Sequence, residues 1–402
     1  IDVPATGRPV VVLERIQLTP PKLIDQRSVQ QRLRDLTGVT DLQTGIEQLA
    51  SVARAMEEAP DDAPPEMDVT IDVVASEVVS LAVVDRGRRE PELLGVAFDI
   101  GTTTVAGYLL DLARHEVLAS RSEPNAQSSY GADVISRITA CRSGAPLRDA
   151  IRHQLAKMTT ALATECGARS EEVATGAIVG NTTMIHLLLG LDPHSMSRAP
   201  FMPTLIEAMT LAPREIGLPI HERGRVRIPP GVSAYVGTDI IADLLSSGMH
   251  RQEGTSLLVD IGTNGEIVCG GRDRLLACST AAGPAFEGAT IRHGSGGVPG
   301  AISHIRREGS GIVIETIKNA PPQSICGTGL MDAVAMLLAD GVLDETGRLD
   351  PNAASGESSP LYCDRMIEID GEPAVVLADQ EGNGSEHIVL TQGDIRQVQL
   401  AK

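Results

Sequence analysis

Two copies of a short pattern of acidic, glycine and hydroxyl residues stand where apolar runs end. The copies are Asp99-Ile100-Gly101-Thr102-Thr103-Thr104 and Asp260-Ile261-Gly262-Thr263-Asn264-Gly265. Apolar residues resume after each copy, which predicts a strand, a tight turn and a second strand. Glycine lets backbone amides approach an anion, threonine adds hydroxyl donors, and an aspartate at the end of a buried strand needs a charged partner. One copy is compatible with an ordinary turn, but two in the same register predict a duplicated domain that clamps nucleotide phosphates from both sides.

A third glycine-rich segment, Gly327-Thr328-Gly329, opens a predicted helix that runs to Ala339. A helix N-terminus offers free amides and the positive end of a dipole to an anion. A simple helix start with a glycine turn is the alternative, and the two hairpins favour nucleotide binding. Residues 281–288 predict another helix start, with Pro284 near its first turn, and residues 294–300 form a candidate mobile loop.

Composition excludes several classes of function. The net charge of -19 over 402 residues disfavours nucleic acid as a partner, because phosphate backbones would be repelled. The longest apolar runs fall short of a membrane span, and the pattern is that of a cytoplasmic protein.

No two of the six cysteines form a C-x-x-C pair, so neither a zinc ribbon nor an iron–sulfur loop is predicted within the chain. The cysteines are Cys141, Cys166, Cys269, Cys278, Cys326 and Cys363.

Strands and helices alternate along the chain, which indicates an α/β protein. We expect a linker over residues 1–20, a small α/β domain over 21–90, and a larger domain over 91–402. Predicted helices cover residues 28–36, 44–56, 133–141, 146–166, 184–189 and 238–247, and strands cover 10–18, 69–84, 116–120 and 174–179. The chain begins without methionine and ends in a short helical run from residue 395, so it is interpreted as a fragment.

The two hairpins resemble phosphate-1 and phosphate-2 of the acetate and sugar kinase, heat-shock chaperone and actin ATPases. Within that superfamily, the chain resembles the ATP-dependent reductive activators of corrinoid proteins over nearly its whole length. The strings that carry this resemblance are Asp99–Thr104, Gly180-Asn181-Thr182-Thr183-Met184, Asp260–Glu266, Ala282–Gly288, Ile325–Gly329 and, at the start of a middle domain, Pro20–Ser28.

The resemblance implies two ribonuclease-H-like halves, of which the second is incomplete at its C-terminus, with ATP and Mg²⁺ as ligands. Asp99 and Asp260 would hold Mg²⁺ through water, and Asp239, 21 positions before Asp260, would orient the attacking water. Phosphate oxygens would accept from the two turns and from the third loop. These contacts are assigned to Gly101, Thr102, Thr103, Thr104, Gly262, Thr263, Asn264, Gly265, Gly327, Thr328 and Gly329.

By the same resemblance, ATP hydrolysis drives the reduction of a corrinoid protein from Co(II) to Co(I). The electron would come from an N-terminal two-iron two-sulfur domain that these residues do not include, and the protein is expected to be a homodimer. Three alternatives stay open: a small-molecule kinase of the same superfamily, an activator of a radical dehydratase, and a non-catalytic nucleotide-dependent binding module. The second would hold a cluster on paired cysteines, and Cys278 has no clear second cysteine near it in the sequence.

Overall fold

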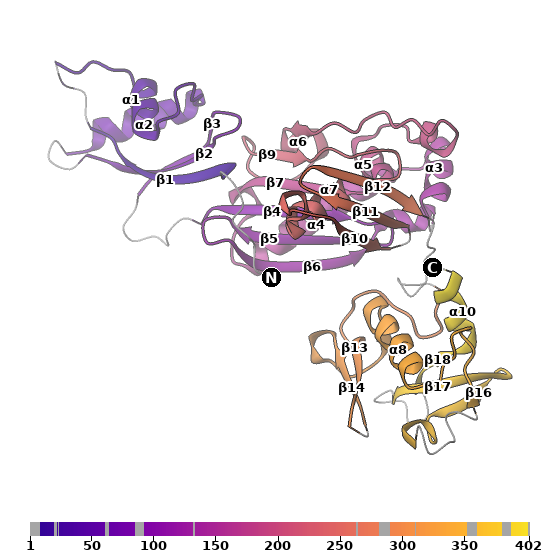
Figure 1. Ribbon diagram of the computed structural model, residues 1–402. Helices are drawn as coiled ribbons and strands as arrows, with labels where there is room; N and C mark the ends of the chain where they lie inside the picture. Colours follow the sequence, from indigo (N-terminus) through magenta and orange to yellow (C-terminus); the bar gives the residue numbers. More distant parts are fainter. Residues whose placement is uncertain are drawn as a thin grey trace. The chain divides into compact units, whose positions relative to one another are not determined.

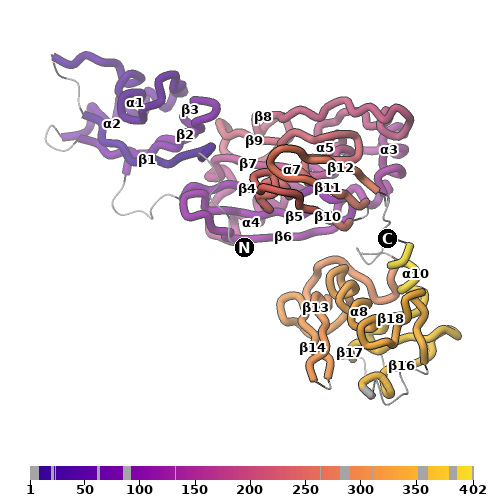
Figure 2. The backbone as a smooth tube through the Cα atoms, viewed as in Figure 1, coloured from indigo at the N-terminus to yellow at the C-terminus, as the bar shows by residue number. Residues whose placement is uncertain are grey.

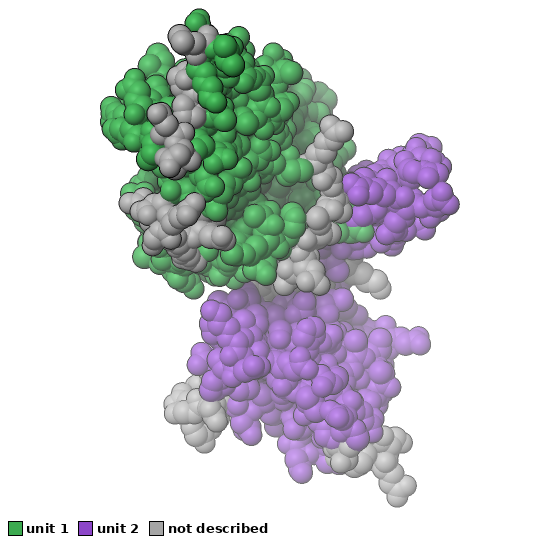
Figure 3. Space-filling view, turned by 90° about the vertical axis from the view of Figure 1, so that its left-hand side faces the viewer, with its two compact units in different colours: residues 1–247 green, residues 248–402 purple. Residues whose placement is uncertain are grey.

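The computed structural model divides the chain into two compact units, residues 1–247 and 248–402, which Figure 3 colours separately. No helix among the described residues combines the length and apolar character needed to cross a bilayer. The structure describes residues 9–19, 22, 24–60, 64–84, 92–131, 133–262, 264–280, 290–309, 311–351, 360–379 and 387–400.

A small module forms the start of the first unit, with two helices against an antiparallel sheet of order β1-β2-β3. Its elements are β1 (Val11–Gln17), α1 (Val29–Thr37), α2 (Ile46–Glu58), β2 (Glu66–Asp72) and β3 (Glu77–Val83). Ser28 caps α1 as predicted: its hydroxyl accepts from the Gln31 amide, and the Gln31 side chain accepts from the Ser28 amide. Leu18 and Leu33 lie in the core of this module.

The strand predicted over residues 10–18 is confirmed as β1, which pairs with β2 along its whole length. Its backbone hydrogen bonds are therefore made inside the small module.

A six-stranded sheet of order β6-β5-β4-β7-β9-β8 forms the rest of the first unit (Figures 1 and 2). Strands β4, β7 and β9 run parallel, and the others are antiparallel to their neighbours. The strands are β4 (Leu94–Ile100), β5 (Thr104–Asp111), β6 (Glu116–Pro124), β7 (Val173–Gly180), β8 (Met209–Leu211) and β9 (Arg225–Ile228). The longer helices are α3 (Val134–Arg142), α4 (Leu147–Glu165), α5 (Thr182–Leu189) and α7 (Thr238–Ser247), which confirms the four helices predicted here.

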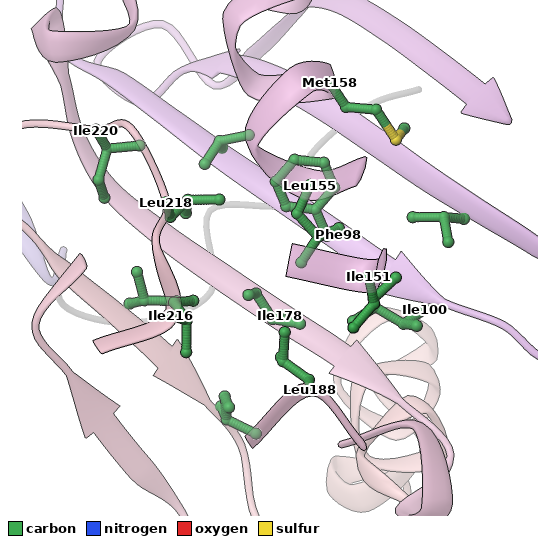
Figure 4. Close-up of a cluster of buried hydrophobic side chains, with 14 of the residues drawn as sticks. Phe98, Ile100, Ile151, Leu155, Met158, Ile178, Leu188, Ile216, Leu218 and Ile220 are labelled. Carbon is green, nitrogen blue, oxygen red and sulfur yellow. The ribbon is translucent and has the colours of Figure 1, made fainter. Parts of the chain in front are cut away.

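Helix α4 packs against one face of this sheet. Alternate side chains of β4, from Leu94 to Ile100, are buried, and Figure 4 shows Phe98 and Ile100 beside Ile151 and Leu155 of α4. The Phe98 ring lies over Gly107 of β5, where a Cβ would come within 2.6 Å of it. Because strand side chains alternate between faces, Asp99 is on the face opposite Phe98 and Ile100. The core therefore fixes which way Asp99 points.

In the part of the second unit that the structure describes, there are three separate three-stranded sheets, with orders β10-β11-β12, β14-β13-β15 and β16-β17-β18. The strands are β10 (Ser256–Ile261), β11 (Gly265–Gly271), β12 (Arg274–Thr280), β13 (Ala301–Glu308), β14 (Gly311–Thr316), β15 (Ser324–Ile325), β16 (Met366–Ile369), β17 (Glu372–Asp379) and β18 (His387–Thr391). The helices are α8 (Gly327–Ala339) and α10 (Gln392–Leu400), close to the two predicted at these places. The helix start expected at residues 281–288 lies outside the described residues.

Candidate phosphate-binding site

The first predicted hairpin is confirmed. Strands β4 and β5 pair from Leu94 and Asp111 up to Ile100 and Val105, so a tight turn connects them. The turn requires glycine at position 101, because a Cβ there would lie 2.7 Å from the Thr104 carbonyl oxygen. Asp99 is exposed at the end of β4, immediately before the turn.

Three consecutive carbonyls of this turn are bound from one side. The Asn125 side-chain amide donates to the Gly101 oxygen at 2.8 Å, and the Asn125 backbone amide donates to the Thr103 oxygen at 2.8 Å. The Arg137 guanidinium donates to the Thr102 oxygen at 2.5 Å. The C=O and N–H of one trans peptide point in opposite directions, so the amides that follow these carbonyls point away from Asn125 and Arg137. Successive amides aimed the same way form a concavity that favours an anion.

Arg137 lies fully buried behind the turn. Besides Thr102, it donates to the Gly131 oxygen at 2.9 Å, and its Nη1 is 3.2 Å from the Met184 sulfur. Burial lowers the pKa of Arg137 to about 10, while the charge of Asp133 acts to raise it, so the side chain is a cation at neutral pH. Among the residues that the structure describes, no carboxylate forms an ion pair with it.

Asn181 orients the Thr102 hydroxyl. The Asn181 side-chain amide donates to Thr102 Oγ1 at 3.0 Å, and its oxygen caps α5 by accepting from the Met184 amide at 3.0 Å. A hydroxyl that accepts one hydrogen bond keeps its own proton to donate. Thr102 is therefore arranged to donate to an oxygen other than that of Asn181.

Asp239 joins the same edge of the sheet through the N-terminus of α7. The Thr238 hydroxyl accepts from the Gly180 amide and donates to the Gly180 oxygen, both at 3.0 Å. A Cβ on Gly237 would lie 2.7 Å from the Asn181 Cα, so the helix start packs directly on the turn after β7. Asp239 is half-buried, and its carboxylate accepts from the Ile240 amide at 2.9 Å. Strands β4 and β7 are parallel neighbours, which brings the elements that carry Asp99 and Asp239 together at their carboxyl ends.

The second predicted hairpin is also confirmed, in the second unit. Asp260 of β10 lies directly across from Glu266 of β11, and burial raises the pKa of Asp260. Glu266 is buried and accepts from the Ser279 hydroxyl at 3.3 Å. Like charges directly opposite each other repel, and a divalent cation would relieve that repulsion.

In the turn of this hairpin, the Gly262 amide donates to the Asn264 oxygen at 3.1 Å. Gly265 is buried where β11 begins, and Thr263 lies outside the described residues. The phosphate contacts assigned to these residues therefore stay predictions.

The third glycine-rich segment follows β15, which belongs to the sheet β14-β13-β15 of the second unit. Gly327 opens α8, and the Thr328 hydroxyl donates to the Ser303 oxygen at 2.8 Å. A Cβ on Gly329 would lie 2.2 Å from the Ile302 oxygen, so glycine is needed there for α8 to pack against β13. Packing alone explains Gly329, and nucleotide binding by this loop stays a prediction.

All six cysteines are free thiols. The register of β11 and β12 places Cys269 opposite Leu276, and Cys278 opposite Ile267. Cys269 and Cys278 are both exposed, and this register makes them diagonal neighbours on one face of the sheet. The sequence alone did not indicate that Cys269 neighbours Cys278, because the β11–β12 turn lies between the two cysteines.

Sequence reasoning also missed three residues of the first site: Asn125, Arg137 and Asn181. Asn181 lies in a string that resembles the corrinoid activators, and an asparagine just before a helix is a recognisable cap. Asn125 and Arg137 carried no comparable signal, because a turn motif does not show which distant side chains bind its carbonyls.

Two family models match consecutive parts of the chain. The model described as the RACo middle region matches residues 94–252, and the model described as the C-terminal domain of RACo, the ASKHA domain, matches residues 254–402. The name "middle region" thus falls on the six-stranded sheet and its helices, and the match does not include the small α/β domain expected over residues 21–90. The domain boundaries near residues 20 and 90 stay predictions.

Two curated proteins are similar in sequence. The corrinoid activation enzyme RamQ of Eubacterium limosum is 35% identical over 325 residues, which cover 79% of this chain and 54% of that protein. The Co(II) methylated amine-specific corrinoid protein reductase of Methanosarcina barkeri is 32% identical over 147 residues, which cover 31% of this chain and 27% of that protein.

A solved structure described as a reductive activator for corrinoid, iron-sulfur protein superposes with a TM-score of 0.80 at 30% identity. The match covers 97% of this chain and 62% of the solved chain. The chain therefore spans little more than half the length of the first curated relative, and about three-fifths of the solved one.

The fold of the chain and its Asp-Ile-Gly-Thr hairpins are those of an actin-like ATPase domain of the ASKHA class. The two family models together with the solved structure show that the chain belongs to the RACo family.

Proposed function

We propose that this chain is the nucleotide-binding part of a protein that reductively activates a corrinoid protein, with ATP binding and hydrolysis coupled to the reduction of Co(II) to Co(I). The observation that carries the nucleotide assignment is the first turn, whose three carbonyls are bound from behind so that the amides face outward. The corrinoid assignment is supported by the names of the relatives.

The residues fit a magnesium nucleotide. The outward amides and the Thr102 hydroxyl are donors for phosphate oxygens, and the exposed Asp99 and half-buried Asp260 provide the carboxylates that water-coordinated Mg²⁺ needs. When bound, Mg²⁺ would neutralise charge on the phosphate oxygens. We propose that Asp239 orients the attacking water, that Thr103, Thr104, Gly262, Thr263, Asn264 and Gly265 contribute to phosphate binding, and that Gly327–Gly329 bind elsewhere on the nucleotide.

The electron is proposed to come from a two-iron two-sulfur domain of the same protein, reduced by a separate donor. One electron converts Co(II) to Co(I), and the cluster is oxidised by one electron in the same step. The corrinoid protein is the proposed partner, and a homodimer in the cytoplasm is the proposed state of the activator.

The test is reduction of a corrinoid protein held in its Co(II) state, followed by visible absorbance under anaerobic conditions. The full-length protein, a chemical reductant and Mg-ATP are expected to yield Co(I), and omission of ATP is expected to abolish it. Formation of Co(I) at the same rate without ATP would contradict the proposal. Phosphate transfer to a sugar or a carboxylic acid would instead identify the small-molecule kinase.

A further inference from the structure

Arg137 is a buried cation without a carboxylate partner among the described residues, and it lies directly behind the first turn. Moving a guanidinium from water into a protein interior is costly unless its hydrogen bonds and its charge are compensated. Its three nitrogens contact two carbonyl oxygens and one sulfur, none of which is charged, and the charge of Asp133 acts on it without an ion pair. The position is therefore one that an anion at the turn would stabilise.

The contact with Thr102 connects this charge to the ligand side of the turn. The Arg137 guanidinium donates to the carbonyl of the peptide whose N–H belongs to Thr103. A hydrogen bond at the oxygen of a peptide polarises that peptide and strengthens its N–H as a donor, and this effect is larger in a low local dielectric. Arg137 therefore acts on an anion through one peptide group, without touching the anion.

The same side chain holds three elements together. It binds the β4–β5 turn at Thr102, the segment before α3 at Gly131, and α5 at Met184. Asn125, which binds the other two carbonyls, has its side-chain amide 3.8 Å from the same Met184 sulfur. The turn is thus pre-shaped from behind before any ligand binds.

We propose that Arg137 is a positioning residue that sets the affinity of the β4–β5 turn for nucleotide phosphates, through its charge and its bond to the Thr102 carbonyl. This inference rests on the proposed binding of nucleotide at that turn. It assigns a share of the phosphate affinity of the turn to a residue outside the Asp-Ile-Gly-Thr motif.

The test compares Arg137→Met, Arg137→Lys and Arg152→Met by isothermal titration calorimetry with Mg-ATP and with adenosine. Arg152 is a matched control, because it is a partly buried arginine of α4 whose side chain, within the described residues, donates only to the carbonyls of Leu188 and Leu189. Arg137→Met removes both the charge behind the turn and the polarisation of the Thr102 peptide, so it is expected to weaken Mg-ATP binding about 10- to 100-fold. Arg137→Lys, which keeps the charge but not the fork of donors, is expected to lose about 3- to 10-fold, and Arg152→Met less than about twofold.

Each outcome is decisive. A folded Arg137→Met protein that binds Mg-ATP within about twofold of wild type overturns the proposal, and so does an equal loss for adenosine and Mg-ATP, which a purely structural role would give. If Arg137→Met does not fold, Arg137→Lys decides: a loss of about threefold or more supports the proposal, and a smaller loss overturns it. Failure of the wild-type protein to bind Mg-ATP would instead overturn the proposed function, and with it the premise of this inference.

Discussion

The two hairpins share a sequence but not their surroundings. Ile100, in the first Asp-Ile-Gly-Thr copy, is completely buried, whereas Ile261, at the same place in the second copy, is 49% exposed. The first hairpin lies within a six-stranded sheet and packs against α4, whereas the second belongs to a three-stranded sheet. The motif thus specifies a strand, a turn and the direction of an aspartate, and the rest of the chain decides how firmly these are held.

One face of the second sheet shows this difference most clearly. Leu257, Val259 and Ile261 alternate along β10, and Leu276 of β12 lies on the same face. All four are about half exposed or more. The corresponding side chains of β4 are in the core. Apolar residues on the equivalent faces therefore contribute very differently to stability.

The largest expected effect tests whether both hairpins serve one reaction. Asp99→Ala and Asp260→Ala are each expected to lower ATP hydrolysis by about a hundredfold or more, because each removes a carboxylate that positions metal or water. The measurement is phosphate release with saturating Mg-ATP.

Asp149→Asn is the control for these two variants, because Asp149 is exposed and pairs only with its neighbour Arg148 in the described structure. We expect wild-type turnover for it. Wild-type turnover in either alanine variant would remove that hairpin from the site, and a large loss in only one would show that the two copies have diverged in role.

A smaller effect should separate the two isoleucines of the motif. Ile100→Val removes a methyl group from a fully buried site and is expected to lower the free energy of unfolding by about 1 kcal/mol. Ile261→Val, at a half-exposed site, is expected to change it by less than about 0.5 kcal/mol. Urea unfolding followed by circular dichroism measures both, and equal losses would mean that Ile261 is buried in solution.

The sequence was sufficient for the elements that local chemistry determines. Ser28 caps α1 as predicted, the helix predicted from residue 133 begins directly after Asp133, and α7 begins and ends at the predicted residues. Strands β13, β14 and β16–β18 were not predicted, because short apolar runs can belong to a strand or a helix and depend on their partners for the assignment.

The site, too, was predictable where local sequence determines it and not where distant residues contribute. Asp99 and the turn that follows it were recognisable from spacing, whereas Asn125 and Arg137 approach the turn from more than 20 residues away in the sequence. Gly329 was assigned to nucleotide binding, and its contact with Ile302 shows that tight packing makes the same demand for glycine.

The smallest expected effect is the pH dependence of Asp260. Burial raises its pKa above the ordinary value of 3.8, so the folded protein favours the protonated form. The contribution of protonated Asp260 to the free energy of unfolding is fully present below pH 3.8. It is lost as the pH rises through the raised pKa, because ionisation of a half-buried carboxylate then opposes folding. Asp260→Asn removes this cost. Without Mg²⁺, its unfolding midpoint is therefore expected to exceed that of wild type at pH 7 and to match it near pH 3.5.

Asp99→Asn is the matching variant of the first hairpin. Because Asp99 is exposed, this variant is expected to unfold at the same midpoint as wild type at pH 7. Addition of Mg²⁺ at pH 7 should stabilise wild type more than Asp260→Asn, because only the carboxylate favours the cation. Midpoints of thermal unfolding measured between pH 3.5 and pH 7 decide the matter. If the unfolding midpoint of Asp260→Asn exceeds that of wild type equally at pH 3.5 and pH 7, the difference comes from side-chain packing and not from charge. The second hairpin would then hold the Asp260 carboxylate without an electrostatic cost.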